Sequence, residues 1–175
     1  MSASLFRVAL LTLSDRVAAG ERNDEGGKVL RESLASLQYT LLAQIVLPDE
    51  LQQLVAQLIH FADHERADLI ITTGGTGLSR RDLTPEATLA VIERRLHGME
   101  AAIHAHALTQ TPYAMLSRAV VGVRGQTLII NLPGNPKGVR ENMEVVLPVL
   151  PHALKLLRDE RIADQEHVFR SGHSG

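Results

Sequence analysis

The segment Asp68–Glu86 constrains this chain more than any other, because an apolar run meets a cluster of glycines and then a helix start signal. The β-branched run up to Thr73 is typical of a buried strand. Three glycines follow within four positions, at 74, 75 and 77. Thr84 as a cap and Pro85 at the first helical position then predict a helix. Because glycines between a strand and a helix expose backbone N–H groups, the segment predicts a phosphate-binding turn.

Two familiar nucleotide motifs do not fit this turn. No Gly-Lys-Ser/Thr follows the glycines, which excludes a Walker loop. Arg80 stands where the third glycine of a dinucleotide-binding fingerprint belongs. Glycine clusters also form tight turns that bind nothing, so this alternative stays open for the segment taken alone.

Apolar runs typical of strands alternate with helical patterns along the rest of the chain. We expect strands at 6–14, 39–47, 68–73, 117–123 and 127–131, and helices at 28–37, 50–64, 84–95, 98–108 and from 136 onward. Asp49 is expected to cap the second helix, and the last helix should break around Pro148 and Pro151. This order predicts the α/β class, with a mostly parallel sheet between helical layers in a three-layer α/β/α sandwich.

Length and composition limit the number of domains, the kinds of metal site and the classes of ligand that we expect for this protein. The 175 residues are enough for one well-packed domain, which we place at 1–162, followed by a polar, flexible tail at 163–175. The absence of cysteine excludes disulfides and thiolate metal sites and is compatible with a cytoplasmic protein. We expect no signal peptide and no membrane span. A net charge of −2 argues against broad nucleic-acid binding, so local cations must meet any anionic ligand, with Arg16, Arg80, Arg81 and Lys137 as candidates.

Polar and glycine-rich residues follow several of the expected strands directly. Ser14 and Asp15, Asp49, the glycines from 74, and Gly134 all stand just after a strand. In parallel sheets ligands bind outside the carboxyl ends of the strands. These residues are therefore expected to share one crevice at a single edge of the sheet.

Several motifs in register resemble the molybdopterin adenylyltransferase family of molybdenum cofactor biosynthesis. They are Leu13-Ser-Asp-Arg16, Leu47-Pro-Asp-Glu50, Thr72-Thr-Gly-Gly-Thr-Gly77, Arg81-Asp-Leu-Thr-Pro-Glu86 and Leu132-Pro-Gly-Asn-Pro-Lys137. The resemblance extends from about Arg7 to Leu157 and gives no signal in the tail. It implies a homotrimeric α/β/α protein that binds molybdopterin, a pterin dithiolene with a terminal phosphate. It further implies Mg²⁺ and ATP as the source of AMP for that phosphate, release of pyrophosphate, and hand-over of the product to a molybdate-insertion enzyme.

The resemblance places functional aspartates of the family at Asp49 and Asp82, which we take as catalytic residues and Mg²⁺ ligands. Magnesium prefers hard oxygen ligands, commonly one or two carboxylates with substrate phosphates and waters. Plain structural roles stay open for both residues: Asp49 as a helix cap, and Asp82 as a surface loop residue.

The remaining candidate residues are assigned to substrate and nucleotide binding. Backbone amides of the glycine turn and two hydroxyls suit a phosphate, and the 133–136 loop is expected to form a second backbone cradle. Ser14 and Asp15 could instead simply form the turn that ends the first strand. Arg81 and Lys137 could instead be ordinary solvent-exposed side chains of a loop and of a helix start. The set comprises Ser14, Asp15, Gly74, Gly75, Thr76, Gly77, Ser79, Arg81, Pro133, Gly134, Asn135 and Lys137.

Two other interpretations compete with an enzyme of this kind. A non-catalytic molybdopterin carrier on the same fold would bind the pterin without turning over ATP. A generic phosphatase or kinase is disfavoured, since no nucleophile elbow or Walker motif is present. His60 and His64 share a helical spacing, but the residues between them lack the glutamate of a zinc-protease helix, so a zinc site is not expected.

Overall fold

A six-stranded, mostly parallel sheet forms the middle of the protein, as the computed structural model shows for residues 5–158. The strand order is β2-β1-β3-β6-β5-β4. The first four of these are parallel, and β5 and β4 join in antiparallel fashion. The strands are β1 (Phe6–Leu13), β2 (Tyr39–Leu47), β3 (Leu69–Thr73), β4 (Arg94–Arg95), β5 (Val121–Arg124) and β6 (Thr127–Leu132).

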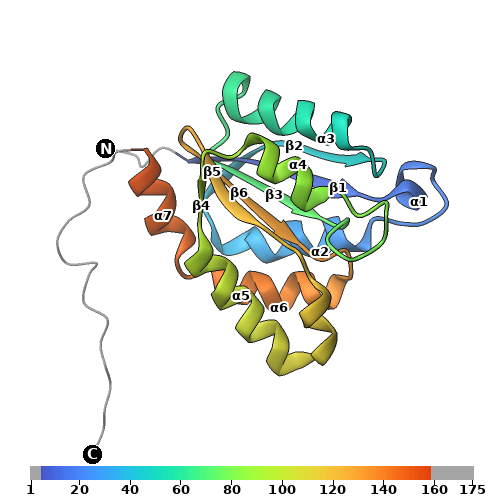
Figure 1. Cartoon of the computed structure of the whole chain (residues 1–175). Helices are drawn as coiled ribbons and strands as arrows, with labels where there is room; N and C mark the ends of the chain where they lie inside the picture. The colour runs from blue at the N-terminus through green and yellow to red at the C-terminus, as the bar shows by residue number, and fades with distance from the viewer. Residues whose placement is uncertain (1–4, 159–175) are drawn as a thin grey trace, which may run out of the picture.

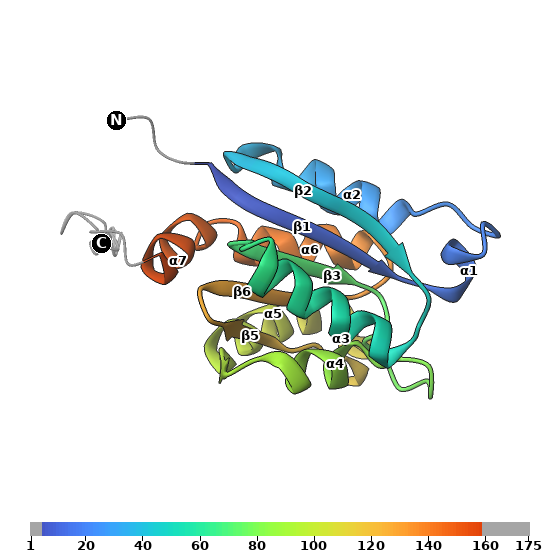
Figure 2. The same cartoon turned by 90° about the horizontal axis from the view of Figure 1, so that it is seen from above.

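Helices cover both faces of this sheet, so the predicted three-layer α/β/α sandwich is confirmed (Figure 1). α3 and α4 lie on one face, and α2, α5 and α6 lie on the other. Seen from above in Figure 2, α1 lies beyond one end of β1 and α7 lies at the opposite end of the molecule. The α-helices are α1 (Asp15–Ala18), α2 (Glu25–Ser33), α3 (Leu51–Ile59), α4 (Thr84–Val91), α5 (His97–Gln110), α6 (Pro136–Val146) and α7 (Leu150–Leu157). Three short helical turns complete the list: η1 (Leu34–Ser36), η2 (His60–His64) and η3 (Pro112–Leu116).

The alternation of side chains along the central strands divides the core in two. In β1, Val8 and Leu10 pack toward the α2 and α6 side, whereas Ala9 and Leu11 pack toward α3 and α4. β3 and β6 alternate in the same way. All of these strands read as continuous apolar runs because both faces of a covered parallel sheet are buried. Their rigidity fixes the positions of the loops that follow them.

Several local expectations are confirmed. The strand expected at 127–131 is β6, which forms a hairpin with β5 through a turn at Gly125, whose φ of 55° is in the left-handed region. The last helix begins at Pro136, as expected, and breaks between Val146 and Leu150, around Pro148. In the described part of the chain, none of the helices has the length and apolarity that crossing a bilayer requires.

Other local expectations were wrong. The helix expected at 28–37 begins at Glu25, because Asp24 caps it and Gly26 and Gly27 lie inside its first turn. The helix expected at 84–95 ends at Val91, and Arg94–Arg95 instead pairs with β5. The helix expected at 50–64 is instead confirmed: α3 begins at Leu51, and the π-helical turn η2 continues it to His64. The tail assigned to 163–175, and both ends of the domain assigned to 1–162, lie outside the described residues.

Candidate active site

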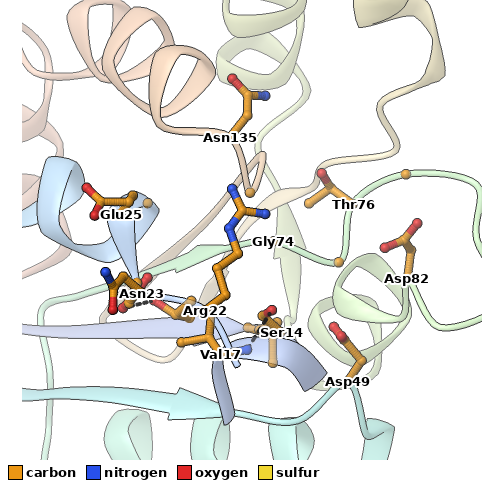
Figure 3. A pocket seen from close by; sticks show the side chains of 17 residues that line it. Ser14, Val17, Arg22, Asn23, Glu25, Asp49, Gly74, Thr76, Asp82 and Asn135 are labelled. Carbon is orange, nitrogen blue, oxygen red and sulfur yellow. Dashed lines mark hydrogen bonds between the residues drawn. The ribbon is translucent and has the colours of Figure 1, made fainter. Parts of the chain in front are cut away.

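A pocket of about 360 Å³ lies where β1 and β3 end, and polar residues line most of it (Figure 3). The chain leaves β1 for β2 on one side and returns to β3 on the other, so the strand order reverses between these neighbours. Such a reversal opens a crevice at the carboxyl ends of the strands. The lining residues are Thr12, Leu13, Ser14, Val17, Arg22, Asn23, Asp24, Glu25, Gly26, Asp49, Gly74, Gly75, Thr76, Gly77, Asp82, Gly134 and Asn135.

Three glycines from separate parts of the chain meet at the floor of the pocket: Gly74 and Gly134 lie in loops, and Gly26 lies in the first turn of α2. A Cβ atom on Gly134 would lie 3.2 Å from the Cα of Gly74, and one on Gly26 would lie 3.0 Å from the carbonyl oxygen of Gly134. Gly74 has a φ of 96°, and its Cβ would lie 2.2 Å from the carbonyl oxygen of Leu13. Only glycine fits at position 74, because both the backbone conformation and the space around it exclude a side chain. The floor is therefore bare main chain.

The glycine turn is bonded to the start of α4 through Thr84. The Thr84 hydroxyl donates to the carbonyl oxygen of Gly74 at 2.9 Å, and the Thr84 N–H donates to that of Gly75 at 3.1 Å. The expected capping role of Thr84 was therefore wrong, since Leu83 occupies the cap position and Thr84 is the first residue of the helix. The hydroxyl stabilises the turn instead of the helix end.

Asp15 and Asp49 tie the ends of β1 and β2 together. The Asp15 N–H donates to Asp49 Oδ2 at 2.9 Å, and the Asp49 N–H donates to Asp15 Oδ1 at 3.0 Å. The expected cap by Asp49 was wrong, because Glu50 occupies the cap position of α3 and no side chain caps that helix. Asp49 is consequently held in place by the strand ends, and it lines the pocket.

The pKa values of Asp15 and Asp49 are shifted in opposite directions. Burial raises the pKa of the Asp49 carboxyl above its ordinary 3.8, and the charges of Asp15 and Asp82 raise it further, against the opposing effect of the Asp15 N–H. Hydrogen bonds from the Arg81 side chain lower the pKa of Asp15. Arg81 reaches both oxygens of that carboxylate, at 2.9 and 2.7 Å. Within this pair, Asp49 is thus the carboxylate whose charge is less compensated.

Asp82 reaches the pocket from the loop that follows the glycine turn. Its Oδ2 accepts the Ser79 N–H at 2.8 Å, and the same oxygen would lie 3.0 Å from a Cβ atom on Gly77. On the other side, Asp49 Oδ1 would lie 3.4 Å from a Cβ atom on Gly75. The two carboxylates therefore stand against the same short glycine turn and repel one another.

Arg118 holds this loop from outside the pocket. Its N–H donates to the carbonyl oxygen of Thr76 at 2.9 Å, and its guanidinium donates to the carbonyl oxygens of Gly77 and Asp82 at 2.7 and 2.6 Å. A further bond joins it to Glu86 at the start of α4. Arg118 was not predicted from the sequence, because no local motif marks a residue about forty positions away from the loop it supports.

The N-terminus of α2 forms the opposite wall, and it was not predicted from the sequence either. Asp24 accepts the Gly27 N–H at 2.8 Å and the Thr12 hydroxyl at 2.8 Å, which fixes the helix start against β1. The available signal was an aspartate placed three residues before Gly27, a spacing typical of an N-cap. Together with residues of β1 and α1, the lining residues that were not predicted as site residues are Thr12, Leu13, Val17, Arg22, Asn23, Asp24, Glu25 and Gly26.

Nine of the fourteen predicted site residues line the pocket: Ser14, Asp49, Gly74, Gly75, Thr76, Gly77, Asp82, Gly134 and Asn135. The other five lie around it. Asp15 and Arg81 bond to one another, Ser79 bonds to Asp82, and Pro133 accepts a hydrogen bond from Thr73 at 2.8 Å. Lys137 is 78% exposed and lies 3.5 Å from Glu141. The candidate cations Arg16 and Arg80 do not line the pocket either.

Among the described residues, the pocket carries four carboxylates, from Asp24, Glu25, Asp49 and Asp82, against the single guanidinium of Arg22. Two of them suit a magnesium ion: Asp49 and Asp82 flank the glycine turn, and their mutual repulsion would be relieved by a cation. Within residues 5–158, no group of three His, Asp or Glu side chains could hold a metal by itself. Substrate oxygens would therefore have to complete the coordination.

A comparison with protein families assigns the chain. A family model described as "Probable molybdopterin binding domain" matches residues 9–152. The chain belongs to this family. The match includes every predicted site residue and ends inside α7.

Individual members of the molybdopterin-binding family differ in how much of their length corresponds to this chain. Gephyrin of Dictyostelium discoideum is 41% identical over 174 residues, which cover 94% of this chain but only 24% of gephyrin. A molybdopterin adenylyltransferase of Helicobacter pylori is 38% identical over 154 residues, which cover 87% of this chain and 88% of that enzyme. Among solved structures, the molybdopterin biosynthesis enzyme MoaB of Thermus thermophilus is 49% identical, with a TM-score of 0.84, and the match covers 89% of this chain and 98% of that one.

Proposed function

We propose that this protein is a molybdopterin adenylyltransferase of molybdenum cofactor biosynthesis. In the proposed reaction, an oxygen of the terminal phosphate of molybdopterin attacks the α-phosphorus of ATP. The bond between the α-phosphorus and the oxygen that bridges it to the β-phosphate breaks, AMP stays on the pterin phosphate, and pyrophosphate leaves. The support is a relative with that name that matches this chain over nearly its whole length, together with the family match.

One observation carries the proposal: Asp49 and Asp82 stand on either side of the exposed glycine turn, in one pocket. A reaction between two polyanions depends mainly on positioning and on charge neutralisation. The turn supplies backbone N–H groups on the pocket surface, which favour phosphate. The carboxylates supply the hard oxygen ligands for magnesium, which when bound would neutralise phosphate charge.

The residues around the turn then hold the substrates in place. Thr76 lines the pocket and carries a hydroxyl beside the glycine backbone, where it can donate to a phosphate oxygen. Asn135 caps α6 and accepts the Gly138 N–H at 2.6 Å, so it keeps the 133–136 loop against the floor. Thr84 and Arg118 hold the turn in its position, because they donate hydrogen bonds to its carbonyl oxygens.

The decisive experiment mixes the purified protein with molybdopterin, Mg²⁺ and ATP labelled at the α-phosphate. Transfer of the label to the pterin, with release of one pyrophosphate for each label transferred, is the expected result. Binding of molybdopterin without label transfer or pyrophosphate release would identify a carrier and refute the enzyme. Omission of Mg²⁺ should abolish transfer, and this control tests the role of the two carboxylates.

Three further features complete the proposal. We propose a homotrimer, supported by exposed apolar side chains on α4, α5 and η3, namely Leu89, Leu108, Tyr113, Met115 and Leu116.

The adenylylated product would pass to a molybdate-insertion enzyme, because a mixed anhydride of this kind is an activated intermediate. We place the reaction in the cytoplasm, which cell fractionation can test.

A further inference from the structure

Arg22 is the one cationic side chain among the described residues that line the pocket. It lies in the loop that joins α1 to α2, and Figure 3 shows its side chain extending into the pocket. Within the described part of the chain, no hydrogen bond or ion pair engages its guanidinium. A charged group with five N–H donors therefore stands in the pocket with its donors unused by the protein.

Two other arginines close to the site, Arg81 and Arg118, already bond to groups of the protein. Arg81 donates to both oxygens of Asp15, and Arg118 donates to the carbonyl oxygens of Gly77 and Asp82. Both have structural roles in the loops and neither lines the pocket. Arg22 differs from them in position and in bonding.

Nearby carboxylates do not account for the position of Arg22, because other groups of the protein bond to most of them. Asp24 accepts from the Gly27 N–H and the Thr12 hydroxyl, Asp49 accepts from Asp15, and Asp82 accepts from Ser79. Arg22 is exposed, and an exposed ion pair contributes little, so these carboxylates do not fix its side chain. Since none of the described carboxylates pairs with it, its donors are available to an anion from outside the protein.

We propose that Arg22 binds a phosphate group of a substrate held in this pocket. The proposal rests on the proposed function, which brings two phosphate-bearing substrates to the site, molybdopterin and ATP. A planar guanidinium matches the geometry of two phosphate oxygens and forms charge-assisted bonds with both. The glycine backbone at the floor adds N–H donors near the same wall.

Equilibrium binding tests this role without catalysis. Isothermal titration calorimetry measures the affinity of the wild type, Arg22→Ala and Arg22→Lys for molybdopterin and, separately, for Mg-ATP. Arg22→Ala should weaken one of the two ligands by about 10- to 100-fold, because one bidentate charged contact is lost. Arg22→Lys should recover part of the loss, since it keeps the charge without the fork. The weakened ligand is the one whose phosphate Arg22 binds.

Arg31→Ala is the matched control, because Arg31 is an exposed arginine on the last turn of α2 and does not line the pocket. It removes the same charge and should change neither affinity by more than about twofold. Added NaCl should weaken the wild-type interaction with the affected ligand more than that of Arg22→Ala. A purely structural role of the loop would not produce this difference in salt dependence.

Three outcomes would overturn the role of Arg22. The first is that Arg22→Ala binds both ligands as tightly as Arg31→Ala does. The second is that it weakens both ligands equally while its melting temperature falls, which indicates a distorted loop. The third is that the wild type binds neither ligand, which also refutes the proposed function. If the wild type binds both ligands but transfers no label, the proposed function fails alone, and the binding data still decide the role of Arg22.

Discussion

At the scale of single residues, Asp49 and Asp82 are the most informative sites. We expect Asp49→Asn and Asp82→Asn to lower adenylyl transfer by about 100-fold or more, because each removes an anionic oxygen ligand of the proposed magnesium, which would neutralise the phosphate charge. Folding should be retained, since the amide oxygen of the substituted side chain can still accept the Asp15 N–H that Asp49 accepts at 2.9 Å. Pyrophosphate release measures the rate, and circular dichroism measures the fold.

Asp63→Asn is the matched control for these two variants. Asp63 is a carboxylate bonded to Arg124 outside the pocket, at 2.9 and 2.6 Å. Its replacement should leave the rate within about twofold of the wild type, because exposed ion pairs contribute little. Wild-type rates in Asp49→Asn or Asp82→Asn would refute the assignment.

The raised pKa of Asp49 predicts a pH dependence of stability. The carboxyl of Asp49 binds its proton more tightly in the folded protein than in the unfolded chain, where its pKa is near 3.8. The contribution of Asp49 to the free energy of unfolding therefore falls as the pH rises above 3.8. Asp49→Asn lacks this contribution. The free energy of unfolding of the variant, relative to the wild type, should therefore rise between pH 3.8 and neutrality. Urea unfolding at several pH values measures it, and a constant difference would contradict a raised pKa.

Gly74 gives a stability test of the pocket floor. We expect Gly74→Ala to destabilise the protein by about 2 kcal/mol or more, because alanine is strained at a positive φ and its Cβ has no room. Gly98 is the control: a Cβ atom there meets nothing within 4 Å, and the residue lies in α5. Gly98→Ala should stabilise by up to about 1 kcal/mol. Thermal unfolding of both variants measures the change in stability, which should be negative at Gly74 and positive at Gly98.

At the scale of elements, Arg118 links the glycine loop to the segment before β5. We expect Arg118→Ala to lower kcat by about 10-fold or more, since small displacements of a positioned group carry a large kinetic cost. Amide hydrogen exchange should speed up at 76–82, while exchange in β1 stays unchanged. Arg118→Lys should recover little, because one ammonium cannot replace a guanidinium that bonds to several separated oxygens. Unchanged exchange in the loop would show that the loop is held by other contacts.

The elements also show where sequence patterns reach their limit. Helices and strands with long apolar patterns, such as β1 and α6, were predicted close to their observed bounds. The start of α2 was missed because Gly26 and Gly27 argue for a loop, whereas the Asp24 side chain and close contact with Gly134 favour small residues inside the first turn. β4 was missed because a two-residue strand has no periodicity and exists only through its pairing with β5.

At the scale of the whole molecule, the exposed apolar residues of η3 are the surface that we assign to the proposed homotrimer, which the family resemblance implies. We expect sedimentation equilibrium to give three times the chain mass of 19.1 kDa. Met115→Glu should shift the protein toward monomers, because Met115 is 66% exposed and a charge there opposes apolar contact. Leu156→Glu on α7 is the control, with a similar exposure of 53% and no expected effect. A monomeric wild type would refute the trimer.

The site as a whole was only partly predictable for a topological reason. The edge of the sheet that holds the pocket was predicted, because parallel strands place their carboxyl ends together. The strand order was not predicted, and it decides that α2 rather than another helix forms the second wall. Arg22 and Arg118 were missed because their importance depends on where the fold places them: Arg22 reaches the pocket from the loop before α2, and Arg118 bonds to a loop about forty residues away in the sequence.

The meeting of Gly26, Gly74 and Gly134 has a practical consequence for inhibitor design. A compound that bonded only to this surface would touch peptide groups, which are the same whatever amino acid is encoded. Mutations that introduce a larger residue there would collide with neighbouring main chain, so a variant that escapes the compound would be expected to lose folding stability as well.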